Sequence, residues 1–304
     1  MSFNLSLLTP SFAICATDRR LTWPAGGVVT ERSNKLTLFH CADGHGFITY
    51  CGIGRDFERR TPSDWIAAMP ELGSNSVNEI ASAIKTDADR RLTSMAGRGL
   101  DVRHSFVIGG FKLGSPFALL ISNYDSLDGE ERPRADPVLS ISGRILSPDA
   151  KHTHPFLLVA TGARPRRPAR LKACLLPQIR AGASAKALRR TIVKTVKDVA
   201  YQNDRKASVG SSVQSVVVAR NGSIDAALSV PGGASLHEGP NMIGRNMSIK
   251  DMYIDISGDP KSRYDPARGA ARIEEFACGN CGGPVPEGYR RCGMCDAPRG
   301  LAAN

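Results

Sequence analysis

Three side chains near the start of the chain could together form an activated nucleophile: Ser2, Asp18 and Lys35. Because Ser2 is small, we expect removal of Met1, which would leave a serine with a free α-amine beside its hydroxyl. An α-amine titrates near ~7.7–8.0, so it can accept the hydroxyl proton. A nearby lysine lowers the pKa of the hydroxyl, and a nearby carboxylate holds that lysine in place. If the fold brings the three together, the sequence predicts a hydrolase.

Each of these residues also has a plainer explanation. Ser2 is compatible with an ordinary chain start, Asp18 with a solvated strand end, and Lys35 with an exposed lysine at the start of a strand. The combination favours chemistry, because a hydroxyl, an amine base and a supporting charge are what an activated nucleophile requires.

Length and composition describe an ordinary globular chain with an excess of positive charge. The 304 residues are 41% hydrophobic and 23% charged, and 40 basic residues against 29 acidic ones give a net charge of +11. No apolar run approaches the ~18 residues that a membrane helix needs. The apolar start lacks a basic leader and is interrupted by Pro10, so it is a poor signal peptide. We therefore expect a cytoplasmic protein with no membrane segment.

The sharpest basic cluster runs from Arg164 to Lys172. Such a cluster could bind nucleic acid or an acidic partner. The alternative is a solvated loop and helix start. This alternative is favoured because no aromatic residue interleaves with the charges, and only 6% of all residues are aromatic.

The eight cysteines fall into two groups. Four are scattered and are expected to be buried small hydrophobic residues: Cys15, Cys41, Cys51 and Cys174. The other four form two Cys-x-x-Cys pairs separated by ten residues: Cys278, Cys281, Cys292 and Cys295. Two such pairs complete a tetrahedral S₄ site suited to Zn²⁺. The stretch resembles the short zinc ribbons at the ends of many bacterial proteins. We expect a structural zinc, because all four ligands come from the protein; two disulfides are the alternative.

Hydrophobic periodicity and turn residues predict three groups of strands separated by two pairs of helices. Helices are expected to begin at Thr61 and at Ser76, the latter as a Ser-x-x-Glu capping box, and to span about 169–180 and 185–200. Strands are expected at 3–8, 12–17, 35–41, 47–52, 104–110, 116–122, 138–142, 156–161, 213–219 and 224–229. This order suggests two sheets covered by helices. We expect one domain over 1–230, a linker or arm over 231–276 and the zinc ribbon over 277–304.

These residues and elements resemble the proteasome family of N-terminal nucleophile hydrolases over about residues 2–230. In that family the first strand pair runs without a gap from an N-terminal threonine to an Asp-x-Arg signature, and Ser2 to Asp18-Arg19-Arg20 has the same spacing. The family's catalytic lysine precedes an aliphatic strand, as Lys35 does. Its oxyanion-hole glycine resembles Gly52 in Cys51-Gly52-Ile-Gly-Arg-Asp56, and its Gly-Ser-Gly turn resembles Ala-Thr161-Gly162.

The resemblance implies an α+β fold, a four-layer αββα sandwich of two antiparallel sheets. It also implies acyl transfer on a peptide or other amide substrate. Ser2 would attack, the N–H of Gly52 would stabilise the oxyanion, Asp18 would orient Lys35, and Thr161 would assist the nucleophile. Family members commonly form rings, so a homo-oligomer is expected. The chain departs from the family in three ways: serine replaces threonine, the Asp-to-Lys gap is one residue longer, and the family's later aspartate has only an approximate match in Asp204…Ser208-Val-Gly210-Ser211.

Two other functions stay open. One is a non-catalytic scaffold of the same fold, which would dock its partners through the zinc ribbon. The other is a nucleic-acid-associated protein that uses the ribbon and the basic cluster, and its binding would weaken steeply with salt.

Overall fold

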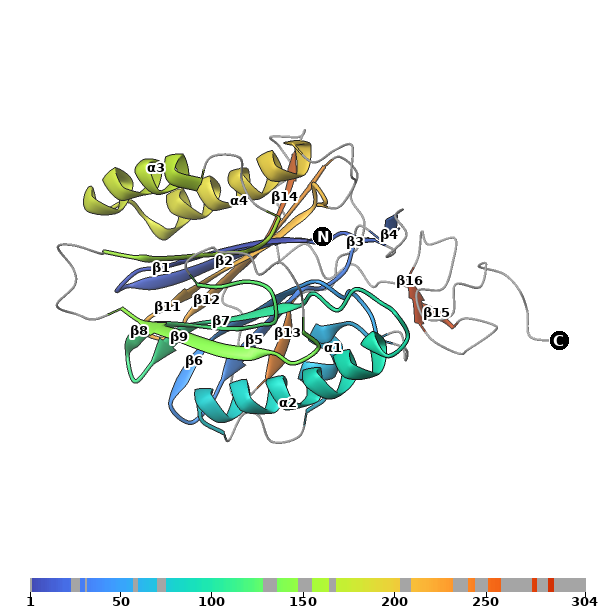
Figure 1. Ribbon diagram of the computed structural model, residues 1–304. Helices are drawn as coiled ribbons and strands as arrows, with labels where there is room; N and C mark the ends of the chain where they lie inside the picture. Colours follow the sequence, from blue (N-terminus) through green and yellow to red (C-terminus); the bar gives the residue numbers. More distant parts are fainter. Residues whose placement is uncertain are drawn as a thin grey trace.

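The chain folds into two six-stranded sheets that lie face to face between two pairs of helices (Figure 1). This computed structural model describes residues 2–22, 28–30, 32–56, 60–69, 75–127, 136–146, 155–163, 168–202, 209–231, 240–243, 251–257, 275–277 and 284–286. Within these residues the layers run helices, sheet, sheet, helices, in agreement with the predicted sandwich.

The first sheet has the strand order β10-β1-β2-β11-β12-β14. Its bounds are β1 Phe3–Leu8, β2 Phe12–Asp18, β10 Leu157–Gly162, β11 Val213–Ala219, β12 Ile224–Pro231 and β14 Asp251–Ser257. Neighbouring strands are antiparallel except β14, which pairs in parallel with β12. The helices α3 (Pro168–Arg180) and α4 (Ala185–Gln202) cover its outer face.

The second sheet has the order β13-β5-β6-β7-β8-β9. Its bounds are β5 Leu36–His40, β6 Gly44–Cys51, β7 Ser105–Lys112, β8 Ser115–Ser122, β9 Ser140–Ile145 and β13 Asn241–Ile243. Here β13 pairs in parallel with β5, and the other pairs are antiparallel. The helices α1 (Pro62–Ala67) and α2 (Val77–Ala96) cover the outer face. Both begin where the sequence suggested, α2 with the predicted capping box at Ser76 and α1 with a second capping box at Thr61.

Alternation along β1 divides its side chains between two layers. Phe3, Leu5 and Leu7 pack against α3 and α4, whereas Leu8 belongs to the core between the two sheets. That inner core is apolar at one end, with Cys15, Phe47 and Val216 among its buried members. Near the first residues of β1 the buried side chains are instead polar, among them Asn4, Thr17 and Asp18. Ser2 therefore lies at a hydrophilic end of the sandwich.

The remaining strands are short. β3 (Leu21–Thr22) and β4 (Val28–Thr30) form a small ribbon between β2 and β5, and β15 (Glu275–Ala277) pairs with β16 (Pro284–Pro286). None of the helices in the described part of the chain is long and apolar enough to cross a membrane.

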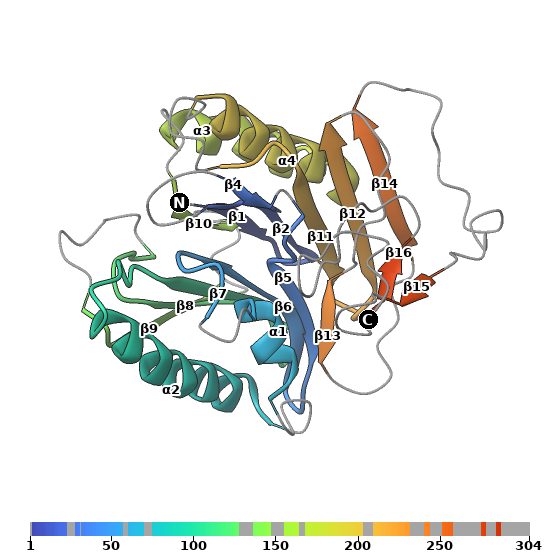
Figure 2. The same cartoon turned by 90° about the vertical axis from the view of Figure 1, so that its right-hand side faces the viewer.

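Parts of the segment 231–276, expected to be a linker or arm, form strands: β14 lies at the edge of the first sheet and β13 at the edge of the second (Figure 2). The division of the chain into domains stays a prediction. Cys174 was expected to be buried and is exposed on α3, whereas Cys15, Cys41 and Cys51 are buried as predicted.

Candidate active site

Ser2 lies directly before β1 and is held by the end of β10. The pairing of these strands sets Phe3 opposite Gly162, and the N–H of Ala163 donates a hydrogen bond of 2.8 Å to the carbonyl of Ser2. Gly162 has φ +82°, and a Cβ atom there would lie 2.0 Å from the Ser2 carbonyl oxygen. Only glycine therefore fits at this position, because any side chain would push the backbone of Ser2 away.

Lys35 connects Ser2 to Asp18. Its Nζ atom lies 2.7 Å from the Oγ atom of Ser2, 3.1 Å from Oδ2 of Asp18 and 2.6 Å from the carbonyl oxygen of Arg20. An ammonium group has three N–H donors, and here each has an acceptor. Both charged side chains are fully buried, so their attraction is screened far less than it would be in water. The three predicted residues are thus brought together.

Asp18 is held by main-chain donors as well as by Lys35. Its Oδ1 atom accepts from the N–H of Phe3 at 2.8 Å, and its Oδ2 atom accepts from the N–H groups of Arg20 and Gly210, each at 3.1 Å. A buried carboxylate is stable only when it is paired and hydrogen-bonded in this way. Gly210 lies in the segment Asp204…Ser208-Val-Gly210-Ser211, whose sequence approximately matches the later aspartate of the family pattern. Asp204 and Ser208, in the same match, lie outside the described residues.

Arg19 positions the segment that leads into Lys35. It is 1% exposed, and its guanidinium donates to the carbonyls of Ser33 at 3.1 Å and Arg32 at 2.6 Å. The main chain of Ser33 donates in turn to the Arg19 carbonyl at 3.0 Å. These bonds hold residues 32–33 against the end of β2, and Lys35 follows at once. The Asp-x-Arg signature contained Arg19, but the sequence did not indicate this role.

Gly52 directly follows β6, at the end of the strand that lies beside Ser2. The Sγ atom of the preceding Cys51 lies 3.4 Å from the carbonyl oxygen of Thr161, and a Cβ atom on Gly162 would lie 2.9 Å from that sulfur. Gly52 has φ +113°, which favours glycine. The predicted oxyanion donor is therefore in the neighbourhood of the nucleophile, and its role stays a prediction.

Thr161 faces a polar cluster next to Ser2. Its Oγ1 atom lies 3.4 Å from Nδ2 of Asn4 and 3.6 Å from Sγ of Cys51, and Asn4 accepts in turn from the hydroxyl of Thr17. Among the described residues it makes no hydrogen bond to Ser2, because the register sets Thr161 opposite Asn4. Any help that Thr161 gives the nucleophile would pass through this cluster.

Two further residues adjoin the site. Asp125 is buried, and its Oδ2 atom accepts from the N–H of Gly162 at 3.1 Å, which ties the end of β8 to the residue that contacts Ser2. No role was assigned to Asp125 from the sequence. Burial raises the pKa of the Cys51 thiol to about 12, so this neighbour stays a thiol and does not compete as a nucleophile.

The four predicted zinc ligands, Cys278, Cys281, Cys292 and Cys295, lie outside the described residues. Within the described part of the chain, no group of three or more His, Cys, Asp or Glu residues is arranged to hold a metal ion. The zinc ribbon stays a prediction.

Comparison with known proteins gives matches in structure only. No protein-family model and no curated protein matches the chain. One solved structure is a Gly-1 mutant of Anbu from Hyphomicrobium sp. strain MC1, with a TM-score of 0.48 and 11% identity over 74% of this chain and 84% of that one. Another is Anbu, an ancestral beta-subunit, from Yersinia bercovieri, with a TM-score of 0.46 and 13% identity over 71% and 80%. Identities of 11% and 13% are too low to indicate a shared function.

Proposed function

We propose that this protein is an N-terminal nucleophile hydrolase that cleaves a peptide or other amide bond with Ser2 after removal of Met1. The observation that carries the proposal is the hydrogen bond between Lys35 and the hydroxyl of Ser2, with Lys35 itself held by Asp18. Residues 2, 18 and 35 come from three separate strand ends, and the fold brings a hydroxyl, a buried ammonium and a carboxylate together beside the start of β1.

We assign Lys35 the role of an electrostatic group and the α-amine that of the base. As an ammonium, Lys35 has no lone pair with which to take the Ser2 proton, and its three N–H groups have the acceptors that this form requires. Its charge instead stabilises the negative charge that develops on Oγ. The base is then the α-amine of Ser2, acting directly or through one water.

The reaction proceeds in two acyl-transfer steps. As the Oγ atom of Ser2 bonds to the substrate carbonyl carbon, its proton passes to the α-amine and the carbonyl electrons move onto oxygen, where the N–H of Gly52 stabilises them. The C–N bond then breaks and the leaving amine takes the proton from the α-ammonium. Water attacks the resulting ester of Ser2 by the same route, which releases the acid and restores the hydroxyl.

The test uses full-length protein without an N-terminal tag. Intact mass spectrometry first establishes whether Met1 is absent and the new amine unmodified. A peptide vinyl sulfone is then expected to add one label per chain to the wild type and none to S2A. The matched control is S6A, because Ser6 is also buried on β1 but does not contact Lys35; it should label like the wild type. Equal labelling of S2A, or retention of Met1 in all molecules, would refute the proposal.

We also propose self-association, with β9 as the contact. Among the described strands β9 lies at the edge of its sheet, and all six of its residues are exposed. The side chains of Ile141 and Ile145 are 41% and 64% exposed. An edge strand with apolar side chains is a template for association. The variant I141K/I145K should lower the mass measured by light scattering, and an unchanged mass would exclude β9 as the contact.

A structural zinc in the ribbon is the third part of the proposal, and it rests on the sequence motif. The four thiolates would fold a segment too small to bury a core of its own. Such thiolates persist in a reducing compartment, which agrees with a cytoplasmic location.

A second candidate function is a non-catalytic scaffold that binds nucleic acid, and one observation favours it. The span from α3 to α4 contains eight basic residues and one acidic residue, whereas α2 on the opposite face contains three of each. Exposed members include Arg170, Lys172, Arg190 and Lys194. Binding of a labelled duplex that falls steeply between 50 and 200 mM salt would support this function, and no binding at low salt would exclude it.

A further inference from the structure

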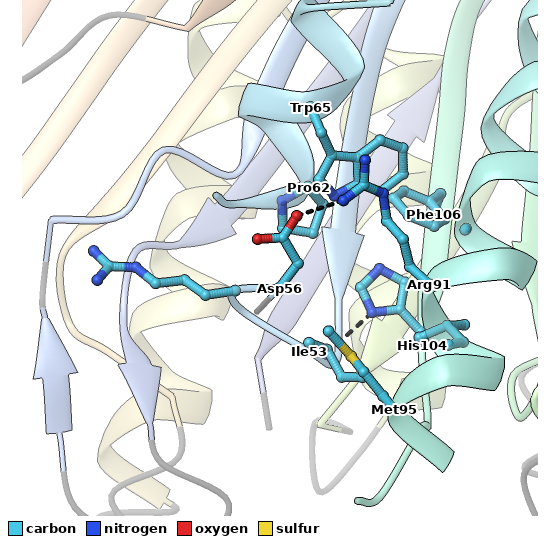
Figure 3. A pocket seen from close by; sticks show the side chains of 11 residues that line it. Ile53, Asp56, Pro62, Trp65, Arg91, Met95, His104 and Phe106 are labelled. Atoms are coloured by element: carbon cyan, nitrogen blue, oxygen red, sulfur yellow. Dashed lines mark hydrogen bonds and ion pairs between the residues drawn. The ribbon is translucent and has the colours of Figure 1, made fainter. Parts of the chain in front are cut away.

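The loop that carries Gly52 is held by the imidazole of His104. The Nδ1 atom of His104 accepts a hydrogen bond of 3.0 Å from the N–H of Ile53, the residue that follows Gly52 (Figure 3). The loop itself, residues 52–56, has no regular secondary structure. Its conformation therefore depends on contacts of this kind.

Contacts with residues outside the loop hold His104 in place. Its own N–H donates to Oδ1 of Asn123 at 2.8 Å, and its carbonyl accepts from the hydroxyl of Ser122 at 3.2 Å. The ring stacks on Tyr50 at 6.0 Å between centroids and contacts Phe106 at 4.5 Å. The ring has little room to turn, so the direction of its Nδ1 lone pair is set.

The imidazole is neutral, as an acceptor must be. Burial lowers the pKa of His104 to about 3, because a charged ring would lose its hydration. Since Nδ1 accepts from Ile53, the proton of the neutral ring lies on Nε2.

Gly52 is confined by the same residue from a second direction. A Cβ atom on Gly52 would lie 2.2 Å from the carbonyl oxygen of Arg103 and 2.8 Å from Cα of His104. On its other side, Cys51 is paired with Ser105 in the sheet. The peptide before Gly52 is thus set by the strand and the peptide after it by His104. The N–H of Gly52 lies in the planar Cys51–Gly52 peptide that the strand sets. The bond from Ile53 to His104 holds the next peptide, so it keeps the backbone from rotating about Gly52 and turning that N–H away.

The far end of the loop has an anchor of its own. The guanidinium of Arg91 pairs with the carboxylate of Asp56 and lies 5.2 Å from the ring centroid of Trp65. Between the two anchors is a cavity of about 20 Å³ lined by His104, Phe106, Met95 and others. This volume suits about one water molecule. Any effect of His104 on the proposed reaction would pass through the loop that it holds.

We propose that His104 is a positioning residue, which directs the N–H of Gly52 at the oxyanion by holding the Gly52–Ile53 peptide. This inference rests on the proposed function. An interaction that acts only on the developing oxyanion changes kcat and leaves KM nearly unchanged. Loss of one oxyanion donor lowers kcat by about 10²–10³-fold, and a misdirected donor should lower it by about 10-fold or more.

Two substitutions separate positioning from packing. H104N keeps an acceptor near the place of Nδ1 but loses the ring, whereas H104F keeps the ring between Tyr50 and Phe106 but loses the acceptor. If His104 has a positioning role, kcat of H104N should stay within a few-fold of the wild type, whereas kcat of H104F should fall. Of the two variants, H104F should nevertheless have the higher thermal stability. A packing role predicts the reverse order of kcat. M95L, at a residue that lines the same cavity but forms no hydrogen bond with residues 52–56, is the matched control and should resemble the wild type in kcat.

Amide hydrogen exchange at Ile53 gives a readout that does not depend on activity. Protection is expected in the wild type and in H104N, and fast exchange in H104F. If S2A turns over substrate as fast as the wild type, the proposed function fails, and exchange at Ile53 still decides whether His104 holds the loop. If turnover requires Ser2 but H104F keeps the wild-type kcat, the inference about His104 alone is overturned. Should H104F not fold, H104L replaces it with the same expectations for kcat and exchange.

Discussion

The Nζ atom of Lys35 lies 2.7 Å from the Oγ atom of Ser2, at a site where the lysine side chain is 0% exposed. A charge so placed is stable only while its partners remain, because no water can replace them. The same contact that would activate the nucleophile is therefore part of the folded core. Activity and stability should respond together when this network is changed, and separately when only the hydroxyl is removed.

Removing the charge of Lys35 should destabilise the fold as well as abolish activity. K35M leaves the carboxylate of Asp18 buried with main-chain donors only, which should lower the free energy of unfolding by about 3–5 kcal/mol. D18N alone should also destabilise. The double variant D18N/K35M should lose less than the sum of the two, because neither charge remains. Urea denaturation of the four proteins measures this coupling, and additive losses would show that the ion pair is unimportant for stability.

Ser2 offers the opposite case. S2A removes a hydroxyl that is 5% exposed and keeps the Lys35–Asp18 pair. One acceptor of the lysine is lost, so a cost of about 1–2 kcal/mol is expected with full loss of acylation. A loss of stability as large as that of K35M would indicate that Ser2 belongs to a structural network only.

The stability of the protein should fall as the pH is lowered from about 6.5 towards 3, and His104 should account for part of the decrease. The pKa of His104 is about 3 when folded and near 6.5 in an unfolded chain. Between these values the unfolded state binds a proton that the folded state does not, so folding is favoured by higher pH. The slope from this residue is at most about 1.4 kcal/mol per pH unit.

H104F serves as the comparison, because it cannot bind that proton. The difference in unfolding free energy between wild type and H104F should therefore change between pH 6.5 and pH 4 and stay constant above pH 7.5. Urea denaturation at four pH values measures it. A difference that does not vary with pH would mean that His104 is protonated in the folded protein as readily as in the unfolded one.

Much of the site could be predicted because local patterns determine it. The alternation of β1 and β2 places residues 2 and 18 at the same end of one hairpin, and the capping residues Thr61 and Ser76 mark the starts of α1 and α2. Lys35 directly precedes β5 in the other sheet. Once the two sheets lie face to face, Lys35 therefore comes close to Ser2 and Asp18. Strand period and turn chemistry carry this information within short windows.

What could not be predicted depends on partners far away in the sequence. The three-residue strand β13 and the edge strand β14 come from a Gly-, Pro- and Asn-rich segment, and they obtain their hydrogen bonds from β5 and β12. The roles of Arg19 and Asp125 are set by carbonyl and N–H groups of other loops and strands. The exposure of Cys174 likewise could not be predicted, because it depends on which face of α3 packs against the sheet.

The predicted ribbon should contain one zinc ion per chain. Elemental analysis of protein purified without a metal-affinity tag is expected to give a zinc content near one per chain, and C278S/C292S should lower it to background, because two ligands do not hold zinc tightly. The matched control is C174S, which removes an exposed cysteine of α3 and should keep the zinc. Zinc-free wild type with its cysteines oxidised would favour the two-disulfide alternative.

Gly162 should tolerate no side chain, although another glycine with a similar backbone does. In G162A the new methyl group would lie 2.0 Å from the carbonyl oxygen of Ser2 at φ +82°, so the backbone at the nucleophile must move. Gly182, between α3 and α4, has φ +71° with nothing within 4 Å of its Cβ position. G182A should therefore cost only the conformational strain, about 1–2 kcal/mol, and keep full acylation by the vinyl sulfone. G162A should cost more in urea denaturation and lose acylation. If G162A acylates at the wild-type rate, the position of Ser2 against the end of β10 is not required for the nucleophile, and the site must be assembled in another way.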